Sequence, residues 1–377
     1  MIVIVKIIAK QKNMLYELYL FFISLGVFTT SMGISSSLLE FIHNICLVVS
    51  IFFAVCALCV EKQKFSFFIL EIVALLIGVI SYLISKNTDF LYTILTILLI
   101  RKIPIDCVLK VIFNIRMIMF FIVVGTSLVG LSPIGTIAKT SAEKGALLGF
   151  QHANVFAGSV GILILLYLAI NRENLTAMKL FIVTVIVLVV YLVSHTRIFF
   201  VLMLMTLFLM TRKGKHSFKI FKWILPVMIV LNIVLIGMRI TNIGVNIVDK
   251  IDVLFNGRML LSQMNLKYYP ITLMGQYVDI NIIASENKYY ALDNGYIYLL
   301  INYGVLGLVL FCWFIQTAMR NCIKQKDYVL CVITSVFMVW IVYEGMMASA
   351  PANFALLFAF ADMNKQVNER KGEQNDT

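Results

Sequence analysis

The sequence predicts an all-α, polytopic membrane protein, and its composition and the length of its apolar runs are the observations that predict it. Hydrophobic residues make up 61% of the 377 residues and charged residues only 13%, which is about half the charged share of a soluble domain. Several apolar runs reach the length of about 20 residues that a helix needs to cross a bilayer. Helices are expected because every backbone N–H and C=O must find a partner inside the membrane. We therefore expect one membrane domain over residues 1–377.

About twelve transmembrane helices are predicted from these runs. They lie near residues 14–34, 38–60, 65–85, 89–100, 111–131, 152–171, 179–194, 197–211, 218–238, 294–319, 328–347 and 350–363. The fourth, seventh, eighth and last runs are short, so they are tilted neighbours, re-entrant segments or half-inserted segments. Residues 1–9 are apolar but are interrupted by Lys6 and followed by no small-residue cleavage site. No removable signal peptide is expected.

The distribution of cations predicts the orientation. Most of the 31 Lys and Arg residues lie in short loops on one side, as in Arg101-Lys102 and in the basic segment 212–222. Basic loops stay in the cytoplasm, so this side is expected to be cytoplasmic, together with both termini. Residues 132–151 and 239–293 then form a short and a long extracytoplasmic loop. Topology and contact with anionic membrane lipids explain the net charge of +12 without a nucleic-acid partner.

Two charged residues, Glu71 and Arg116, fall inside predicted spans, where ionisable side chains are costly and indicate function by default. Each lies about six residues from the cytoplasmic end of its span, which corresponds to a depth of roughly 9 Å. We expect them either to pair with each other or to be accommodated separately. In the second case Arg116 extends to the interface and Glu71 is protonated or hydrated.

Polar side chains at outer helix ends are candidates for binding an anion. His152 and Asn154 lie at the start of a predicted span, where the helix dipole favours an anion, although any polar helix start looks similar. Arg197 begins another span after a very tight turn and is either an interfacial anchor or an anion ligand. Glu344 and Asn353 lie at the outer ends of the last spans, where each either faces the same surface or caps a helix.

The loop 239–293 is the predicted location of the active site because it is the one long polar segment of an apolar chain. Residues 255–270 predict a turn and then a short amphipathic helix, which ends before Pro270 and lays its apolar face on the bilayer. Residues 271–276 are expected to be extended. The loop ends at Asp293, where the next apolar run begins.

Several short motifs resemble, in order and spacing over most of the chain, those of the Wzy-type polysaccharide polymerases. The motifs are Gly149-Phe150-Gln151-His152-Ala153-Asn154, Thr196-Arg197, Asn256-Gly257-Arg258, Thr272-Leu273-Met274-Gly275, Asp293-Asn294-Gly295-Tyr296, Tyr303-Gly304-Val305-Leu306-Gly307, Glu344 and Asn353. Each motif alone is weak, and their succession carries the resemblance. Two positions depart from the family pattern: Ala153 stands where the family often has proline, and His195 where it often has serine.

The resemblance to this family, which shares a superfamily with the O-antigen ligases, implies a glycosyltransferase on the outer face of the bacterial cytoplasmic membrane. Oligosaccharide repeat units carried on undecaprenyl diphosphate would serve as donor and acceptor and be joined into capsule, exopolysaccharide or O-antigen chains. Flippase and chain-length regulator proteins are the implied partners. The family's ligases work without a metal, and the outward loops contain Asp249-x-x-Asp252 in place of Asp-x-Asp, so no metal or other cofactor is expected.

The resemblance also implies roles for individual residues. Arg197 and Arg258 are assigned to the leaving diphosphate, with Arg239 behind them, because a guanidinium meets phosphate oxygens with two donors. Asp293 is the leading candidate for deprotonating or orienting the acceptor hydroxyl and His152 is the second, whereas the alternative is that Asp293 only caps a helix. The remaining predicted contacts, to the glycan or in support of the site, are Asn154, Asn294, Tyr296, Tyr303, Glu344 and Asn353.

Two other functions remain open at this stage. A ligase that attaches finished glycan to a protein or lipid acceptor shares the donor chemistry. A transporter, such as a lipid-oligosaccharide flippase, would place ionisable residues at mid-membrane and show internally repeated halves, and we see neither feature in the sequence.

Overall fold

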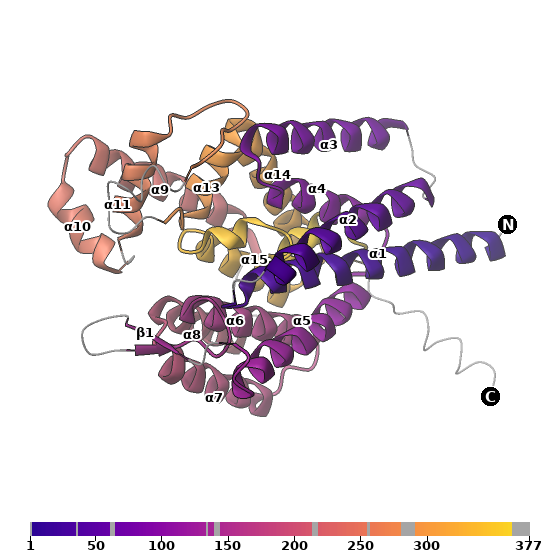
Figure 1. The fold of residues 1–377 in the computed structure, drawn as a ribbon, viewed down its shortest axis with the longest axis horizontal. Helices are drawn as coiled ribbons and strands as arrows, with labels where there is room; N and C mark the ends of the chain where they lie inside the picture. Colours follow the sequence, from indigo (N-terminus) through magenta and orange to yellow (C-terminus); the bar gives the residue numbers. More distant parts are fainter. Residues whose placement is uncertain are drawn as a thin grey trace.

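The computed structural model describes residues 2–34, 37–60, 65–132, 135–138, 144–212, 218–254, 257–279 and 291–363. Helices form most of these segments, and most of the buried hydrophobic side chains form one cluster. In Figure 1, α10 (Val245–Leu254), α11 (Arg258–Tyr268) and β1 (Thr136–Ala138) lie at one end of the bundle, and α1 (Ile2–Ser31) begins at the other. The predicted class of all-α membrane protein is confirmed by these apolar helices.

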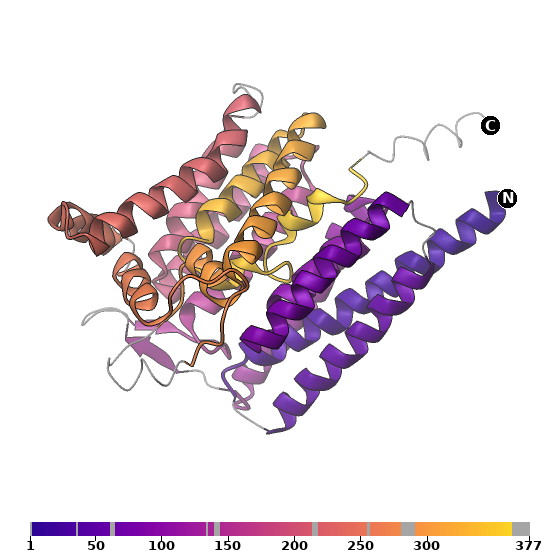
Figure 2. The ribbon, with the colours of Figure 1, turned by 90° about the horizontal axis from the view of Figure 1, so that it is seen from above.

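Among the described residues, seven helices are long and apolar enough to cross a membrane. They are α1 from Gln11 onward, α2 (Ser37–Val60), α5 (Ile105–Leu128), α6 (Ala153–Ile170), α7 (Ala177–Ser194), η1 with α9 (Phe218–Trp223 and Ile224–Ile240) and α14 (Gly304–Lys324). Four shorter apolar helices accompany them, namely α3 (Phe65–Ser85), α4 (Asp89–Leu99), α8 (Arg197–Thr211) and α15 (Tyr328–Trp340). α1 and α2 pack along each other (Figure 2). The predicted number of twelve spans is not confirmed.

The two loops that are predicted to face outward contain structure of their own. The loop 132–151 holds an antiparallel hairpin of β1 with β2 (Lys144–Ala146). In the loop 239–293, α11 ends at Tyr268, as predicted from Pro270, and residues 271–276 form no helix. The apolar side chains of Met259 and Leu261 are buried in the protein, so these two side chains do not lie on a bilayer, contrary to the prediction.

Two predicted spans differ from the structure. The run 294–319 divides into α13 (Gly295–Asn302) and α14, because Gly304 has a φ of +72° and breaks the helix at that point. Residues 350–363 form a 3₁₀-helix, η3 (Phe354–Ala359), after a second short one, η2 (Gly345–Ala348). No transmembrane α-helix forms in this run, and the alternative that it is re-entrant or half-inserted stays a prediction.

The segment after α15, which forms no α-helix, is largely buried, and side chains of neighbouring helices bind part of its backbone. The Asn321 amide donates to the carbonyls of Phe358 at 3.0 Å and Ala359 at 2.9 Å. The hydroxyl oxygen of Thr93 accepts from the N–H of Ala350 at 3.0 Å. Irregular backbone at membrane depth is tolerated only where protein surrounds it in this way.

We call the end of the bundle that carries α10 and α11 the outer end and the opposite end the inner end, as names for the two ends only. An arginine between two carboxylates holds the inner end. Arg172, at the end of α6, lies 2.5 Å from Asp106 of α5 and 2.8 Å from Asp327, the residue that begins α15. It also donates to the carbonyl of Ala169 at 3.0 Å. Burial lowers the pKa of Arg172, but the charges and hydrogen bonds of the two aspartates outweigh this effect and raise it overall. One cation therefore joins α5, α6 and the start of α15.

The intramembrane charges Glu71 and Arg116 do not pair with each other in the described part of the chain. The Glu71 carboxylate instead lies 3.5 Å from the guanidinium of Arg101, at the end of α4. The guanidinium of Arg116 lies over the ring of Phe28, 5.9 Å from its centroid. The predicted pair is wrong because α3 packs against α4, which brings Arg101 to Glu71 first.

Candidate functional site

The candidate site is built around Arg258, the first residue of α11. Gly257 precedes it with a φ of +75°, a left-handed conformation that glycine adopts at little cost. The carboxylate of Asp252 accepts the N–H groups of Met259 at 2.8 Å and of Leu260 at 2.9 Å, and so caps the helix. The Arg258 side chain is only 6% exposed. The turn and the cap together set the direction in which the guanidinium points.

Asp293 reaches Arg258 because the neighbouring residue, Asn294, does the capping. The Asn294 side chain accepts the N–H groups of Tyr296 and Ile297 and is the N-cap of α13. A side chain on Gly295 would collide with Ile341, whose carbonyl accepts the Gly295 N–H at 2.7 Å. Asp293 therefore does not act as the cap, and its carboxylate forms an ion pair with Arg258.

The Arg258–Asp293 ion pair leaves one of the guanidinium donors without a partner among the described residues. Asp293 is 26% exposed, whereas Arg258 is nearly buried, and the Nε of Arg258 has no hydrogen-bond partner among the described residues. A buried donor without a partner costs about 1 to 3 kcal/mol, and more when the group is charged. Such a cost indicates a group that is retained for a purpose other than stability.

Electrostatics join His152 to this pair. Burial raises the pKa of Asp293 above its ordinary value of 3.8, and the charges of Arg258 and then His152 oppose the rise. His152 occupies the N-cap position of α6 without forming a side-chain cap, and it is exposed. The structure thus pairs one candidate base with one candidate diphosphate ligand, and the charge of the second candidate base, His152, acts on the pKa of Asp293.

The second predicted diphosphate ligand, Arg197, begins α8 beside this group. The Thr196 hydroxyl donates to the Asn154 side-chain oxygen at 3.3 Å, which joins the outer ends of α6 and α8. Arg197 is exposed at the first position of α8. Its role as anchor or anion ligand stays a prediction.

Arg239 lies at the end of α9, where it connects α9 to α10 and α11. Its guanidinium lies 2.5 Å from Asp249 and 3.3 Å from Asp252, and its Nε donates to Gln263 at 3.2 Å. The Gln263 amide returns a bond to the Arg239 carbonyl at 3.2 Å. These contacts hold the loop helices in place, while the predicted role near the diphosphate stays a prediction.

Two glycine motifs that are distant in sequence cross beneath the site. Gly275 has a φ of +89°, and a side chain on it would collide with the backbone of Asn302, while one on Gly304 would collide with Gly275. The N–H groups of Val305 and Leu306 donate to the carbonyls of residues 272 and 273 at 3.0 and 3.1 Å. The extended segment therefore accepts hydrogen bonds from the free N–H groups at the start of α14, and these bonds hold the extended segment of the long loop against this helix.

The two predicted tyrosines are buried and bound to protein groups. The Tyr296 hydroxyl donates to the Met338 carbonyl at 2.9 Å. The Tyr303 ring stacks on Phe90 with centroids 4.7 Å apart, and its hydroxyl lies 3.1 Å from that of Tyr298. In the structure both therefore support helix packing.

Glu344 and Asn353 lie in the irregular segment after α15. Gly345 packs against the backbone of Leu292 and Asp293, which places Glu344 next to the end of the long loop. Asn353 is 1% exposed and donates to the Met347 carbonyl at 3.1 Å. Neither side chain forms a helix cap.

A cavity of about 550 Å³ adjoins the site on the α4 side. Its wall includes Leu292, Lys86 and the Tyr298 hydroxyl, which donates to Asp89 at 3.0 Å and accepts from Asn87 at 2.6 Å. This volume lies within the range of about 300 to 1,000 Å³ typical of small-molecule pockets.

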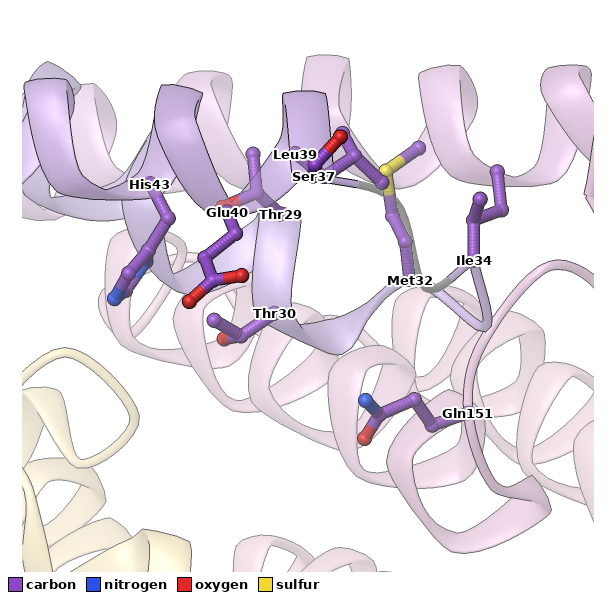
Figure 3. Close-up of a pocket in the computed structure, with 9 residues that line it drawn as sticks. All are labelled: Thr29, Thr30, Met32, Ile34, Ser37, Leu39, Glu40, His43 and Gln151. Atoms are coloured by element: carbon purple, nitrogen blue, oxygen red, sulfur yellow. The ribbon is translucent and has the colours of Figure 1, made fainter.

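A second cavity of about 450 Å³ lies between the outer ends of α1 and α2 and the residue before His152 (Figure 3). Side chains of Thr30, Glu40, His43 and Gln151 line it. The Nδ1 of His43 lies 2.9 Å from the Gly26 carbonyl and donates to it. The two cavities are therefore lined by Leu292 and by Gln151, the residues that precede Asp293 and His152 in the chain.

Sequence reasoning missed two residues that position the site. Asp252 was considered only as part of a metal motif, yet it both caps α11 and pairs with Arg239. Asn232, in α9, accepts a hydrogen bond from Asn294 at 2.7 Å. A single asparagine inside an apolar span was the available signal, since a buried amide needs a partner.

The chain matches no protein-family model, no curated protein and no solved structure. The fold and its apolar helices define a polytopic helical membrane protein, with a partly buried Arg–Asp pair and a nearby histidine at one end of the bundle.

Proposed function

We propose that the protein is a membrane glycosyltransferase that polymerises oligosaccharide repeat units carried on undecaprenyl diphosphate. The reaction would take place on the outer face of the bacterial cytoplasmic membrane, with both termini in the cytoplasm. The order of motifs along the chain supports this assignment, and so does the gathering of Arg258, Asp293 and His152 at one end of the bundle. Flippase and chain-length regulator proteins are the proposed partners.

The observation that carries the proposal is that Asp293 pairs with Arg258 while Asn294 caps α13. A carboxylate that served only the helix would bind the helix N–H groups, which Asn294 already does. Asp293 instead stands partly exposed beside an arginine that lacks one hydrogen-bond partner among the described residues. This arrangement suits an acid–base residue next to an anion-binding group.

In the proposed reaction, an acceptor hydroxyl attacks the anomeric carbon of the donor sugar and the bond from that carbon to the diphosphate oxygen breaks. Asp293 takes the hydroxyl proton, and a carboxylate with a raised pKa is a stronger base than an ordinary one. The leaving diphosphate takes the electron pair, and Arg258 stabilises the negative charge with Arg197. His152 is the alternative base.

The test is polymerisation of purified lipid-linked repeat units by Asp293→Asn protein. We expect a loss of at least about a hundredfold in rate, the lower end of the usual contribution of a general base. The protein should still fold, because the Asn294 cap is untouched. The matched control is Asp249→Asn, the same substitution in the same loop at a carboxylate that also pairs with an arginine. A wild-type rate for Asp293→Asn would remove the catalytic assignment and leave His152 as the base.

A deletion strain separates the three functions. For a polymerase, the lipid-linked ladder collapses to one repeat unit. For a ligase, long chains remain and only their attachment is lost. For a flippase, single units accumulate facing the cytoplasm, and either of the last two results would overturn the proposal.

A further inference from the structure

A third cavity lies at the inner end of the bundle, where the Arg172 network also lies. It has a volume of about 440 Å³ and is bounded by the start of α9 and the last turns of α14. Three cations line it, namely Lys222, Arg320 and Lys324. The rest of its wall is mostly apolar, and Trp223 and Pro226 supply part of that surface.

Helix geometry places these cations around one space. Gln316, Arg320 and Ile323 are spaced by four and three residues, so they lie on one face of α14. The Gln316 amide donates to the Lys222 carbonyl at 3.2 Å and so joins α14 to the end of η1. The cavity is therefore a built junction between two helices that are distant in sequence.

The charge of the cavity is one-sided. No carboxylate lines it, and within the described part of the chain none of the three cations has an acidic partner. Lys222 lies over the Trp223 ring, 5.6 Å from its centroid. Membrane orientation and the dipole of α14 account for cations at this end of the bundle, but neither accounts for their gathering around a cavity with an apolar wall.

We propose that this cavity binds the phosphate headgroup of an anionic phospholipid from the adjacent leaflet. Lys222, Arg320 and Lys324 meet the phosphate, and the acyl chains follow the apolar surface of Pro226 and Ile323. Trp223, which is 59% exposed, lies at the headgroup level that tryptophan prefers. Basic pockets between helices on the cytoplasmic side are typical sites for anionic headgroups.

The bound lipid has a structural consequence. It joins α9 to α14, and the other end of α9 carries Arg239, which holds Asp252 and thereby the start of α11. Bound lipid therefore stabilises the folded protein, whichever reaction the outer site performs.

The experiment compares purified full-length protein with the triple variant Lys222→Gln, Arg320→Gln, Lys324→Gln. Native mass spectrometry counts retained phosphatidylglycerol, and thermal unfolding is followed with added phosphatidylglycerol or phosphatidylcholine. We expect one phosphatidylglycerol per chain to be retained by the wild type and lost by the variant, with apparent affinity falling roughly tenfold or more. Phosphatidylglycerol, and not phosphatidylcholine, should raise the unfolding midpoint of the wild type.

The matched control is the triple variant Lys110→Gln, Arg212→Gln, Lys326→Gln, which removes the same charge from exposed positions outside the cavity. It should bind like the wild type, and equal loss in both variants would show bulk attraction and overturn the site. Equal stabilisation by phosphatidylcholine, or an equal shift from inorganic phosphate alone, would also overturn it. Arg320→Gln alone is the second variant if the triple variant fails to fold, and its unchanged lipid binding would count against the proposal.

Discussion

Two arginines at opposite ends of the bundle show how the same ion-pair chemistry serves two purposes. Arg172 meets two carboxylates and a carbonyl, and one of those carboxylates, Asp327, also caps α15. Arg258 meets one carboxylate, and its Nε has no partner among the described residues. An arginine paired with two carboxylates holds helices together, whereas an arginine paired with one carboxylate keeps a donor available for a ligand.

The pKa shifts point the same way. At Arg172 the aspartates outweigh burial, and the pKa of the guanidinium rises in favour of the charged form. At Asp293 burial outweighs Arg258 and His152, and the pKa of the carboxyl rises in favour of the neutral form. Arg239 contacts two aspartates and Gln263, so it resembles Arg172 more than Arg258. Completeness of pairing therefore separates structural arginines from the candidate functional one.

The largest expected effect is on folding at the inner end. Arg172→Gln removes the cation between Asp106 and Asp327 and leaves two carboxylates facing each other. Breaking a buried pair costs about 3 to 5 kcal/mol, and we expect the lower end because the Asp106 side chain is 35% exposed. Thermal unfolding in detergent measures the loss, and exposed Arg212→Gln is the control. An unchanged midpoint for Arg172→Gln would show that the network does not stabilise the bundle.

The next effect is on rate at the outer end. Arg258→Ala should fold but lose about a hundred- to a thousandfold in polymerisation rate, the usual effect of removing one transition-state donor. Arg258→Lys should restore only part of the activity, because lysine keeps the charge without the two-pronged geometry. Arg212→Lys, at an exposed arginine that lies at the opposite end of α8 from Arg197, is the control and should retain activity. Wild-type rates for Arg258→Lys would contradict the role of the guanidinium.

The smallest expected effect is a shift in pH dependence. Burial raises the pKa of Asp293, so its basic form is lost on acidification at a higher pH than the ordinary 3.8. The charge of His152 lowers this pKa, so His152→Gln should move the acidic limb of the rate profile to higher pH. Rates measured across the acidic range test this. Loss of activity at every pH would instead make His152 the base.

Composition and local pattern determined the class of protein and the position of its polar loop. Hydropathy is a property of each segment alone, so long apolar runs indicate membrane helices before any contact is known. Pro270 likewise ended α11 where the sequence predicted, because a proline disfavours helix in the residue before it. His152, Arg258 and Asp293 were found as candidates from motifs alone.

Only the tertiary structure decided which groups meet. Asp293 and Asn294 are adjacent in sequence and both suit a helix cap, and the contact of Gly295 with Ile341 settled which of them turns toward Arg258. Glu71 pairs with Arg101 instead of Arg116, because α3 packs against α4. Residues 350–363 are apolar enough for a membrane helix, yet they form only the short 3₁₀-helix η3, and Asn321 and Thr93 bind part of their backbone. Such choices depend on groups that are far apart in the chain, and packing alone brings those groups within bonding distance.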